Sequence, residues 1–193
     1  MLYERGVFIH HCYDELNLSQ PDLIRAIHEE YLQAGAEIIE TNTFGANRYR
    51  LERHGLQNKV RAINLAGVKT ARQAVGQLRD KQAAQSYVAG AVGPLGVQIE
   101  PLGKIAFEEA RTAFAEQIRA LAEGGPGVGV DLLVLETMTS LSEVHQAILA
   151  AREAAPWLPI LAMMTIDEGN ALDGSSPEVA AKKLTEWGAD AVG

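Results

Sequence analysis

Residues 131–137 read DLLVLET, an uninterrupted aliphatic run that ends on Glu136 and Thr137. A run of this kind predicts a parallel β-strand, because helices cover both faces of a parallel sheet and both faces then need apolar side chains. The two polar residues at its end indicate that functional side chains, if present, lie at the carboxyl end of the strand. This stretch therefore predicts an α/β protein.

The same pattern occurs at four other places in the chain. They are residues 36–43 (AEIIETNT), 87–93 (YVAGAVG), 159–166 (PILAMMTI) and 190–193 (DAVG). Helical patterns separate them, at about 58–78 and 107–122 among others, and Gly35 and Gly188 mark helix ends. Three further signals predict helix starts: an N-cap at Ser19, a capping box at Ser140 with Glu143, and Ser176 followed by Pro177.

This alternation fits a (β/α)8 barrel or an open doubly wound sheet. The pattern does not separate the two by itself. No glycine-rich dinucleotide fingerprint follows any predicted strand, which disfavours the open sheet. The expected fold class is therefore α/β, with the strands belonging to a barrel.

Composition excludes several classes of protein. The 193 residues carry a net charge of −8 and no basic stripe, so nucleic acid and anionic membrane surfaces are not expected partners. No apolar run is long enough to span a membrane, and the first residues do not resemble a signal peptide. Cys12 is the only cysteine, which excludes an internal disulfide. We expect a cytoplasmic protein.

Candidate site residues lie at the predicted carboxyl ends of strands, where barrel enzymes carry their active sites. Glu136 closes an aliphatic run and is placed to bind an ammonium group, or else to cap the following helix or pair with a neighbour. Asn42 and Thr43 are placed to bind a polar substrate, or else to satisfy the backbone of their own loop.

A metal site at His10, His11 and Cys12 is disfavoured. Adjacent histidines do not easily share one metal, and no second Cys or His cluster faces them in the sequence. A structural role is the better interpretation of these three residues.

Four stretches resemble the homocysteine S-methyltransferase family. They are residues 12–21 (CYDELNLSQP), 34–47 (AGAEIIETNTFGAN), 87–96 (YVAGAVGPLG) and 131–137 (DLLVLET). The resemblance runs in order along the whole chain. The chain is similar to the homocysteine-binding module of cobalamin-dependent methionine synthase, and to that of bifunctional proteins that join this module to methylenetetrahydrofolate reductase.

The resemblance implies a (β/α)8 TIM barrel that transfers a methyl group to the sulfur of homocysteine to give methionine. In that family a zinc ion held by three cysteines keeps the substrate sulfur as the thiolate, the nucleophilic form. It also implies that Glu136 binds the substrate amino group, and that Asn42, Thr43 and Phe44 lie near the pocket. The methyl donor is not determined: methylcobalamin, methyltetrahydrofolate and S-methylmethionine all remain open.

One departure from the family concerns its zinc cysteines, because Cys12 matches none of them. Residues 190–193 resemble the family's sixth strand, after which the first zinc ligand is expected. We therefore expect residues 1–193 to form one incomplete homocysteine-binding domain, with about strands two to six, no metal ligands, no assigned catalytic residue and no turnover alone.

Two alternatives remain at this point. A half barrel that is non-catalytic, or that is completed by self-association or by another chain or domain, follows from its exposed sheet edges. A different (β/α)8 enzyme with Glu136 and Asp167 as acid and base follows from strand-end spacing alone.

Overall fold

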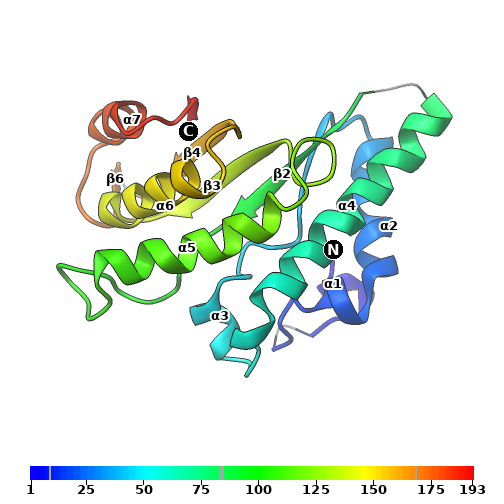
Figure 1. The fold of residues 1–193 in the computed structure, drawn as a ribbon, viewed down its shortest axis with the longest axis horizontal. Coiled ribbons are helices and arrows are strands. Elements are labelled where there is room, and N and C mark those ends of the chain that lie inside the picture. The colour runs from blue at the N-terminus through cyan, green and yellow to red at the C-terminus, as the bar shows by residue number, and fades with distance from the viewer. Residues whose placement is uncertain (9, 83–84, 168) are drawn as a thin grey trace.

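The computed structural model describes residues 1–8, 10–82, 85–167 and 169–193. Its centre is a parallel sheet whose strands follow one another in chain order (Figure 1). The strands are β1 (Ile38–Glu40), β2 (Tyr87–Val92), β3 (Leu132–Met138), β4 (Ile160–Met164) and β7 (Ala191–Val192). All five predicted strands are therefore confirmed, and each pairs in parallel with the next.

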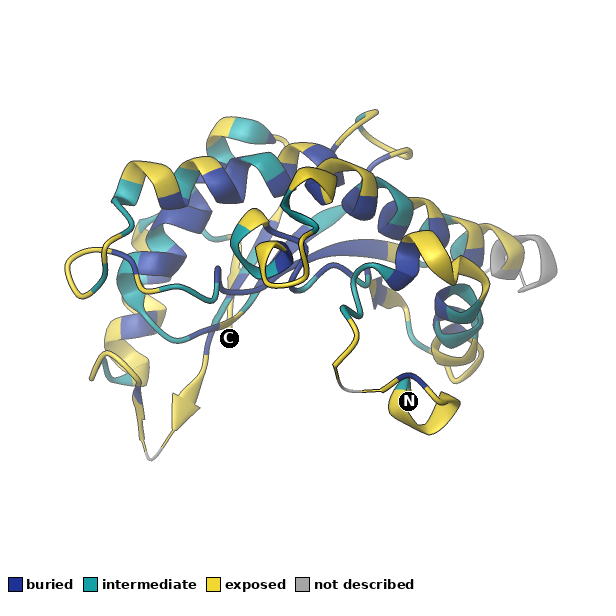
Figure 2. Cartoon of the chain, turned by 90° about the horizontal axis from the view of Figure 1, so that it is seen from below, coloured by how far each residue is buried: buried dark blue, intermediate teal, exposed yellow. Residues whose placement is uncertain are grey.

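Helices connect the strands and cover one face of the curved sheet, as Figure 2 shows. The long ones are α2 (Pro21–Gln33), α4 (Val60–Gln82), α5 (Phe107–Leu121), α6 (Leu141–Ala154) and α7 (Pro177–Glu186). Short helices α1 (Leu16–Ser19) and α3 (Arg48–Glu52) and 3-10 turns at Tyr3–Arg5 and Gln57–Lys59 complete the set. None of the described helices is both long and apolar enough to cross a membrane.

The main core lies between the sheet and the helices. Leu133 and Leu135 of β3 are fully buried, as are Phe114 and Ile118 of α5. A Cβ atom on Gly90 would lie 3.2 Å from Leu133 and from Leu121 of α5, so Gly90 faces the helices and allows close packing. Side chains alternate along a strand, so Ala89 and Ala91 face the opposite, concave side.

Two aspartates tie together the N-terminal ends of the strands, at the edge of the sheet opposite the candidate site. Asp131 accepts hydrogen bonds from Arg72 of α4, at 2.8 Å, and from the backbone N–H of Val88. Asp190 repeats the arrangement with Arg152 and with the N–H of Ile160. The acid that begins these strands therefore has a structural role at the N-terminal end of the sheet.

The helix-start predictions had mixed outcomes. Ser176 accepts a hydrogen bond from the N–H of Val179, as expected of an N-cap. The prediction for Ser19 is wrong: α2 begins at Pro21, and Ser19 ends α1 and donates to Glu15 at 2.8 Å. Proline suits the first position of a helix, which explains the later start.

Ser140 is at the predicted N-cap position of α6 but makes no capping hydrogen bond through its side chain. The capping box is wrong because the carboxylate of Glu143 accepts the N–H of Leu95 at 2.7 Å instead. A buried tie between α6 and the loop after β2 replaces the local cap.

A small antiparallel hairpin follows β4 and was not predicted. Its strands are β5 (Ile166–Asp167) and β6 (Asn170–Ala171), so the predicted strand 159–166 ends early, at Met164. Strands of two residues are too short to show a periodic pattern in a sequence.

Candidate active site

Glu136 lies on the concave side of the sheet, where it meets a second carboxylate. Burial, followed by the charge of Glu40 and a hydrogen bond with it, raises the pKa of Glu136 from 4.5 to about 7. Glu40 ends β1 and Glu136 lies near the end of β3, with β2 between them. The side chains that β2 presents on this side include Ala89 and Ala91, which are short enough for the two carboxyl groups to meet above them.

The backbone beside Glu136 is irregular. Thr137 has a φ of 58°, in the left-handed region that β-branched residues rarely adopt, and the pairing of β3 with β4 shifts register between Leu135 and Met138. A bulge re-aims the side chains next to it and is common near active sites. Thr137 also hydrogen-bonds to Glu136, which opposes the rise in the pKa of Glu136.

Asn42 and Thr43 are engaged with the protein itself. The side-chain amide of Asn42 donates to the carbonyl of Tyr13 at 2.7 Å and to Asn17 at 3.3 Å. Thr43 is fully buried, and its hydroxyl donates to the carbonyl of Ala91 at 2.8 Å. Both residues hold the loop after β1 in place, while their contact with a substrate stays a prediction.

Phe44 packs against the end of β2. A Cβ atom on Gly93 would overlap the Phe44 ring, so only glycine fits there. The guanidinium carbon of Arg50 lies 5.1 Å from the ring centroid, within cation–π range. Phe44 therefore closes the space between the loops after β1 and β2.

A pocket of about 300 Å³ lies beside Phe44 and Asn42. Its other lining residues come from the segment before α1, the loop after β1, α3 and the turn after α3: His11, Cys12, Tyr13, Asp14, Gly45, Arg50, Arg53 and His54. Asn42 and Phe44, which the sequence placed near a substrate, thus share one cavity, whereas Glu136 does not line it.

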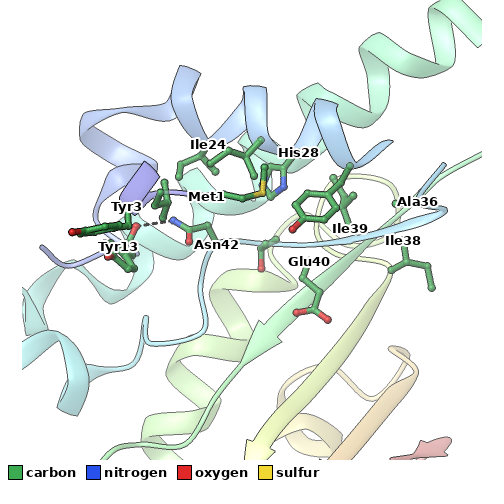
Figure 3. A pocket seen from close by; sticks show the side chains of 14 residues that line it. Met1, Tyr3, Tyr13, Ile24, His28, Ala36, Ile38, Ile39, Glu40 and Asn42 are labelled. Atoms are coloured by element: carbon green, nitrogen blue, oxygen red, sulfur yellow. Dashed lines mark hydrogen bonds between the residues drawn. The ribbon is translucent and has the colours of Figure 1, made fainter. Parts of the chain in front are cut away.

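A larger groove, of about 710 Å³, runs along the outer edge of β1 (Figure 3). Its walls are mostly apolar and come from α2, including Ile24 and His28, from β1, including Ile38 and Glu40, and from the first three residues of the chain. His28 is buried, its Nε2 atom has no hydrogen-bond partner among the described residues, and burial lowers the pKa of His28 to about 4. Glu40 thus faces both this groove and Glu136.

Glu40 is the site residue that sequence reasoning missed. It is a carboxylate that directly follows the aliphatic pair Ile38–Ile39 within the predicted strand at residues 36–43, as Glu136 follows an aliphatic run, and that shared position was the available signal. Asp167, proposed as the partner of Glu136 in an acid–base pair, lies exposed in the β5–β6 hairpin. The carboxyl group that perturbs Glu136 is Glu40.

The described residues do not fit a zinc site. They contain no group of three or more histidine, cysteine, aspartate or glutamate side chains able to hold a metal. Burial raises the pKa of the Cys12 thiol, and Asp14 raises it further, which opposes the thiolate that zinc requires. We therefore derive no step through zinc from these residues.

Comparison with known proteins places this geometry in a family. A family model described as homocysteine S-methyltransferase matches residues 4–193. Methionine synthases of Mycobacterium leprae (strain TN) and Mycobacterium tuberculosis (strain ATCC 25618 / H37Rv) are each 30% identical to this chain over 187 residues. The match covers 94% of this chain and 15% of either synthase, so the chain spans a small part of those relatives.

Solved structures agree on the fold. The homocysteine methyltransferase MmuM from Escherichia coli, in its metallated form, superposes with a TM-score of 0.85 at 24% identity, over 99% of this chain and 69% of that one. Its oxidized form gives a TM-score of 0.82, over 96% and 66%. This likeness identifies the curved sheet as part of a TIM barrel, and together with the family match over nearly its full length it shows that the chain belongs to the homocysteine S-methyltransferase family.

Proposed function

We propose that the protein containing this chain methylates the sulfur of homocysteine to give methionine, and that this chain binds the amino-acid end of the substrate. The observation that supports the proposal is the position of Glu136, a half-buried carboxylate at a strand end, held by a bulge and facing Glu40. Strand ends of this kind carry the active sites of (β/α)8 enzymes.

The ammonium group of homocysteine suits this carboxylate. Near neutral pH Glu136 is about half protonated, because its pKa is about 7. A bound ammonium adds a positive charge beside Glu136, favours its ionised form, and displaces the proton to solvent. We further propose that the loop after β1 forms one side of the substrate site through Asn42, Thr43 and Phe44. Two of these residues, Asn42 and Phe44, line the pocket of about 300 Å³.

The sulfur end of the reaction needs metal ligands, which the described residues of this chain do not bring together. We propose that thiolate ligands for zinc come from other parts of the longer protein, so that this chain alone neither holds zinc tightly nor turns over. The methyl donor stays open among methylcobalamin, methyltetrahydrofolate and S-methylmethionine.

The test is methionine formation by the full-length protein with each donor in turn. Glu136→Gln should raise the KM for homocysteine about tenfold or more, because a charge-assisted hydrogen bond is lost. Glu178→Gln, a change of an exposed glutamate on α7, is the matched control and should leave KM unchanged. No methionine from any donor refutes the function, and an unchanged KM in Glu136→Gln refutes the role of Glu136.

The groove along β1 favours a second proposal, completion of the sheet by another segment or chain. Glu37 and Thr41 bond to β2 through their backbone, so by strand alternation the backbone groups of Ile38 and Glu40 point to the open side. Ile38 is 51% exposed there, and the unpartnered His28 nitrogen faces the same groove. An added extended strand would satisfy this edge.

Light scattering of the 193-residue chain tests completion by self-association. A dimer or larger species that dissociates on Ile38→Lys supports it, because a lysine on an edge strand opposes pairing. A monomer that unfolds cooperatively at every concentration contradicts it.

A further inference from the structure

We propose that the pocket formed by Arg50, Arg53 and Asp14 beside the loop after β1 is a binding site for a small oxyanion, a carboxylate or a phosphate. It lies next to Phe44 and is separate from the carboxyl pair at Glu136. The proposal does not depend on methyl transfer to homocysteine.

Arg50 and Arg53 differ from most other arginines of the described chain in having no acidic partner. Most arginines in the described part of the chain form an ion pair with a carboxylate: Arg5, Arg25, Arg48, Arg61, Arg72, Arg111 and Arg152. Arg50 and Arg53 form none within 4 Å among the described residues, although the chain has an excess of acidic residues. Two neighbouring guanidinium groups thus remain without a carboxylate partner in an acidic protein.

Backbone carbonyl groups hold the side chains of Arg50 and Arg53 in place. Arg50 donates from its Nε atom to the carbonyl of Pro94 at 2.7 Å, and Arg53 donates to the carbonyl of Gly96. Both carbonyls belong to the loop after β2, so the backbone orients the guanidinium groups while leaving most of their N–H donors available. Planar donors fixed in this way suit recognition of an oxyanion by paired hydrogen bonds.

The positive charges of Arg50 and Arg53 repel each other. Burial lowers the pKa of Arg50, and the charge of Arg53 lowers it further, which reflects this repulsion. The charges of Asp14 and Glu143 oppose this lowering without reversing it, and neither carboxylate forms an ion pair with Arg50: Asp14 accepts the N–H of Gly45 at 2.9 Å and Glu143 accepts that of Leu95 at 2.7 Å. An anion bound between the arginines would relieve the remaining repulsion.

The cavity beside the two arginines is large enough for a small anion. The cavity is about 300 Å³, which admits a small anion with some water. Gly45 keeps it open, because a Cβ atom there would lie 2.9 Å from Asp14 Oδ2 and 3.3 Å from Arg50 Cδ. His11 and His54 complete the rim with further potential donors.

Titration of the 193-residue chain with sodium phosphate or sodium acetate, at constant ionic strength and pH 8, tests the site. We expect saturable shifts of the Gly45 amide and of the Arg50 and Arg53 Nε–H signals in ¹⁵N NMR spectra. Arg53→Gln should weaken binding about tenfold or more, since one charged partner is lost. Asp14→Asn keeps an acceptor for Gly45 N–H, removes a negative charge and should tighten binding several-fold.

Arg119→Gln is the matched control, because Arg119 is an exposed arginine on α5 outside the pocket. Equal affinities for phosphate in Arg119→Gln and Arg53→Gln overturn the proposal, as does the absence of saturable shifts with both anions. Saturation by acetate as well as phosphate identifies a carboxylate-sized oxyanion as ligand. Saturation by phosphate alone identifies a phosphate-bearing one.

Discussion

Replacing Glu136 by glutamine should stabilise the folded protein at neutral pH and have little effect at acidic pH. The folded state raises the pKa of Glu136 from 4.5 to about 7, so it binds this proton more tightly than the unfolded chain does. Stability from this group is therefore full below pH 4.5, falls as the pH rises, and is lost above about pH 7. Glutamine has no charge to lose, so the variant avoids the loss.

The size of the effect follows from the shift. A pKa raised from 4.5 to about 7 corresponds to at most about 3.4 kcal/mol. Glu136 is only half-buried, so screening by solvent reduces the expected gain to about 1–2 kcal/mol. Burial is the largest cause and Glu40 comes next, so Glu40→Gln should lower the pKa of Glu136 while leaving it above 4.5.

Urea unfolding of the wild-type protein and Glu136→Gln across pH 4.5 to 8 measures the difference, and ¹³C NMR of the carboxyl carbons measures the pKa directly. Glu178→Gln is the control, because the pKa of this exposed residue is lowered and its loss should not stabilise at any pH. A difference between wild type and Glu136→Gln that does not change with pH, or a Glu136 that titrates near 4.5, would refute the reasoning.

Three further substitutions, two beside the site and one at the opposite end of the sheet, test structural interactions by their free energies of unfolding. Gly93→Ala should destabilise by about 1–3 kcal/mol, because the added methyl overlaps the Phe44 ring. Asp131→Ala should cost about 2 kcal/mol, because Arg72 and a strand N–H lose their partner. Thr137→Gly should change stability by no more than about 1 kcal/mol, in the stabilising direction, because glycine adopts a positive φ without strain.

Each of these predictions has a contrasting measurement. A Gly93→Ala protein as stable as the wild type would mean that Phe44 has room to move. For Asp131, an asparagine should cost less than an alanine because it keeps an acceptor, and equal losses would contradict the hydrogen-bond argument. Val134→Gly, at an ordinary buried strand position, should destabilise strongly, so a similar loss at Thr137 would argue against strain there.

Local patterns predicted much of the fold because they depend on near neighbours in the chain. Each predicted strand is present, because a short aliphatic run between helical segments is buried by the neighbouring strands and the covering helices when it lies in a parallel sheet. The cap at Ser19 failed because its hydroxyl bonds the neighbouring Glu15 and the next helix begins at Pro21, and the capping box at Ser140 failed because a tertiary partner, the N–H of Leu95, bonds Glu143. The β5–β6 hairpin was missed because it is too short for a pattern.

The sequence likewise predicted only part of the candidate site. Its position at strand ends, and Glu136 within it, could be read from the aliphatic run that stops at a carboxylate. Whether Asn42 and Thr43 face a ligand or their own backbone could not be read. Their hydrogen bonds go to Tyr13 and Ala91, which are distant in sequence.

The amino-acid sequence by itself determined the α/β class, the order of strands and helices, and the family to which the chain belongs. Only the tertiary structure decided that Glu136 meets Glu40 and that Arg50 and Arg53 share one pocket with Asp14. The physical reason is that strand composition is a local property, whereas the stagger of neighbouring strands and the closeness of like charges depend on residues brought together by the folded sheet.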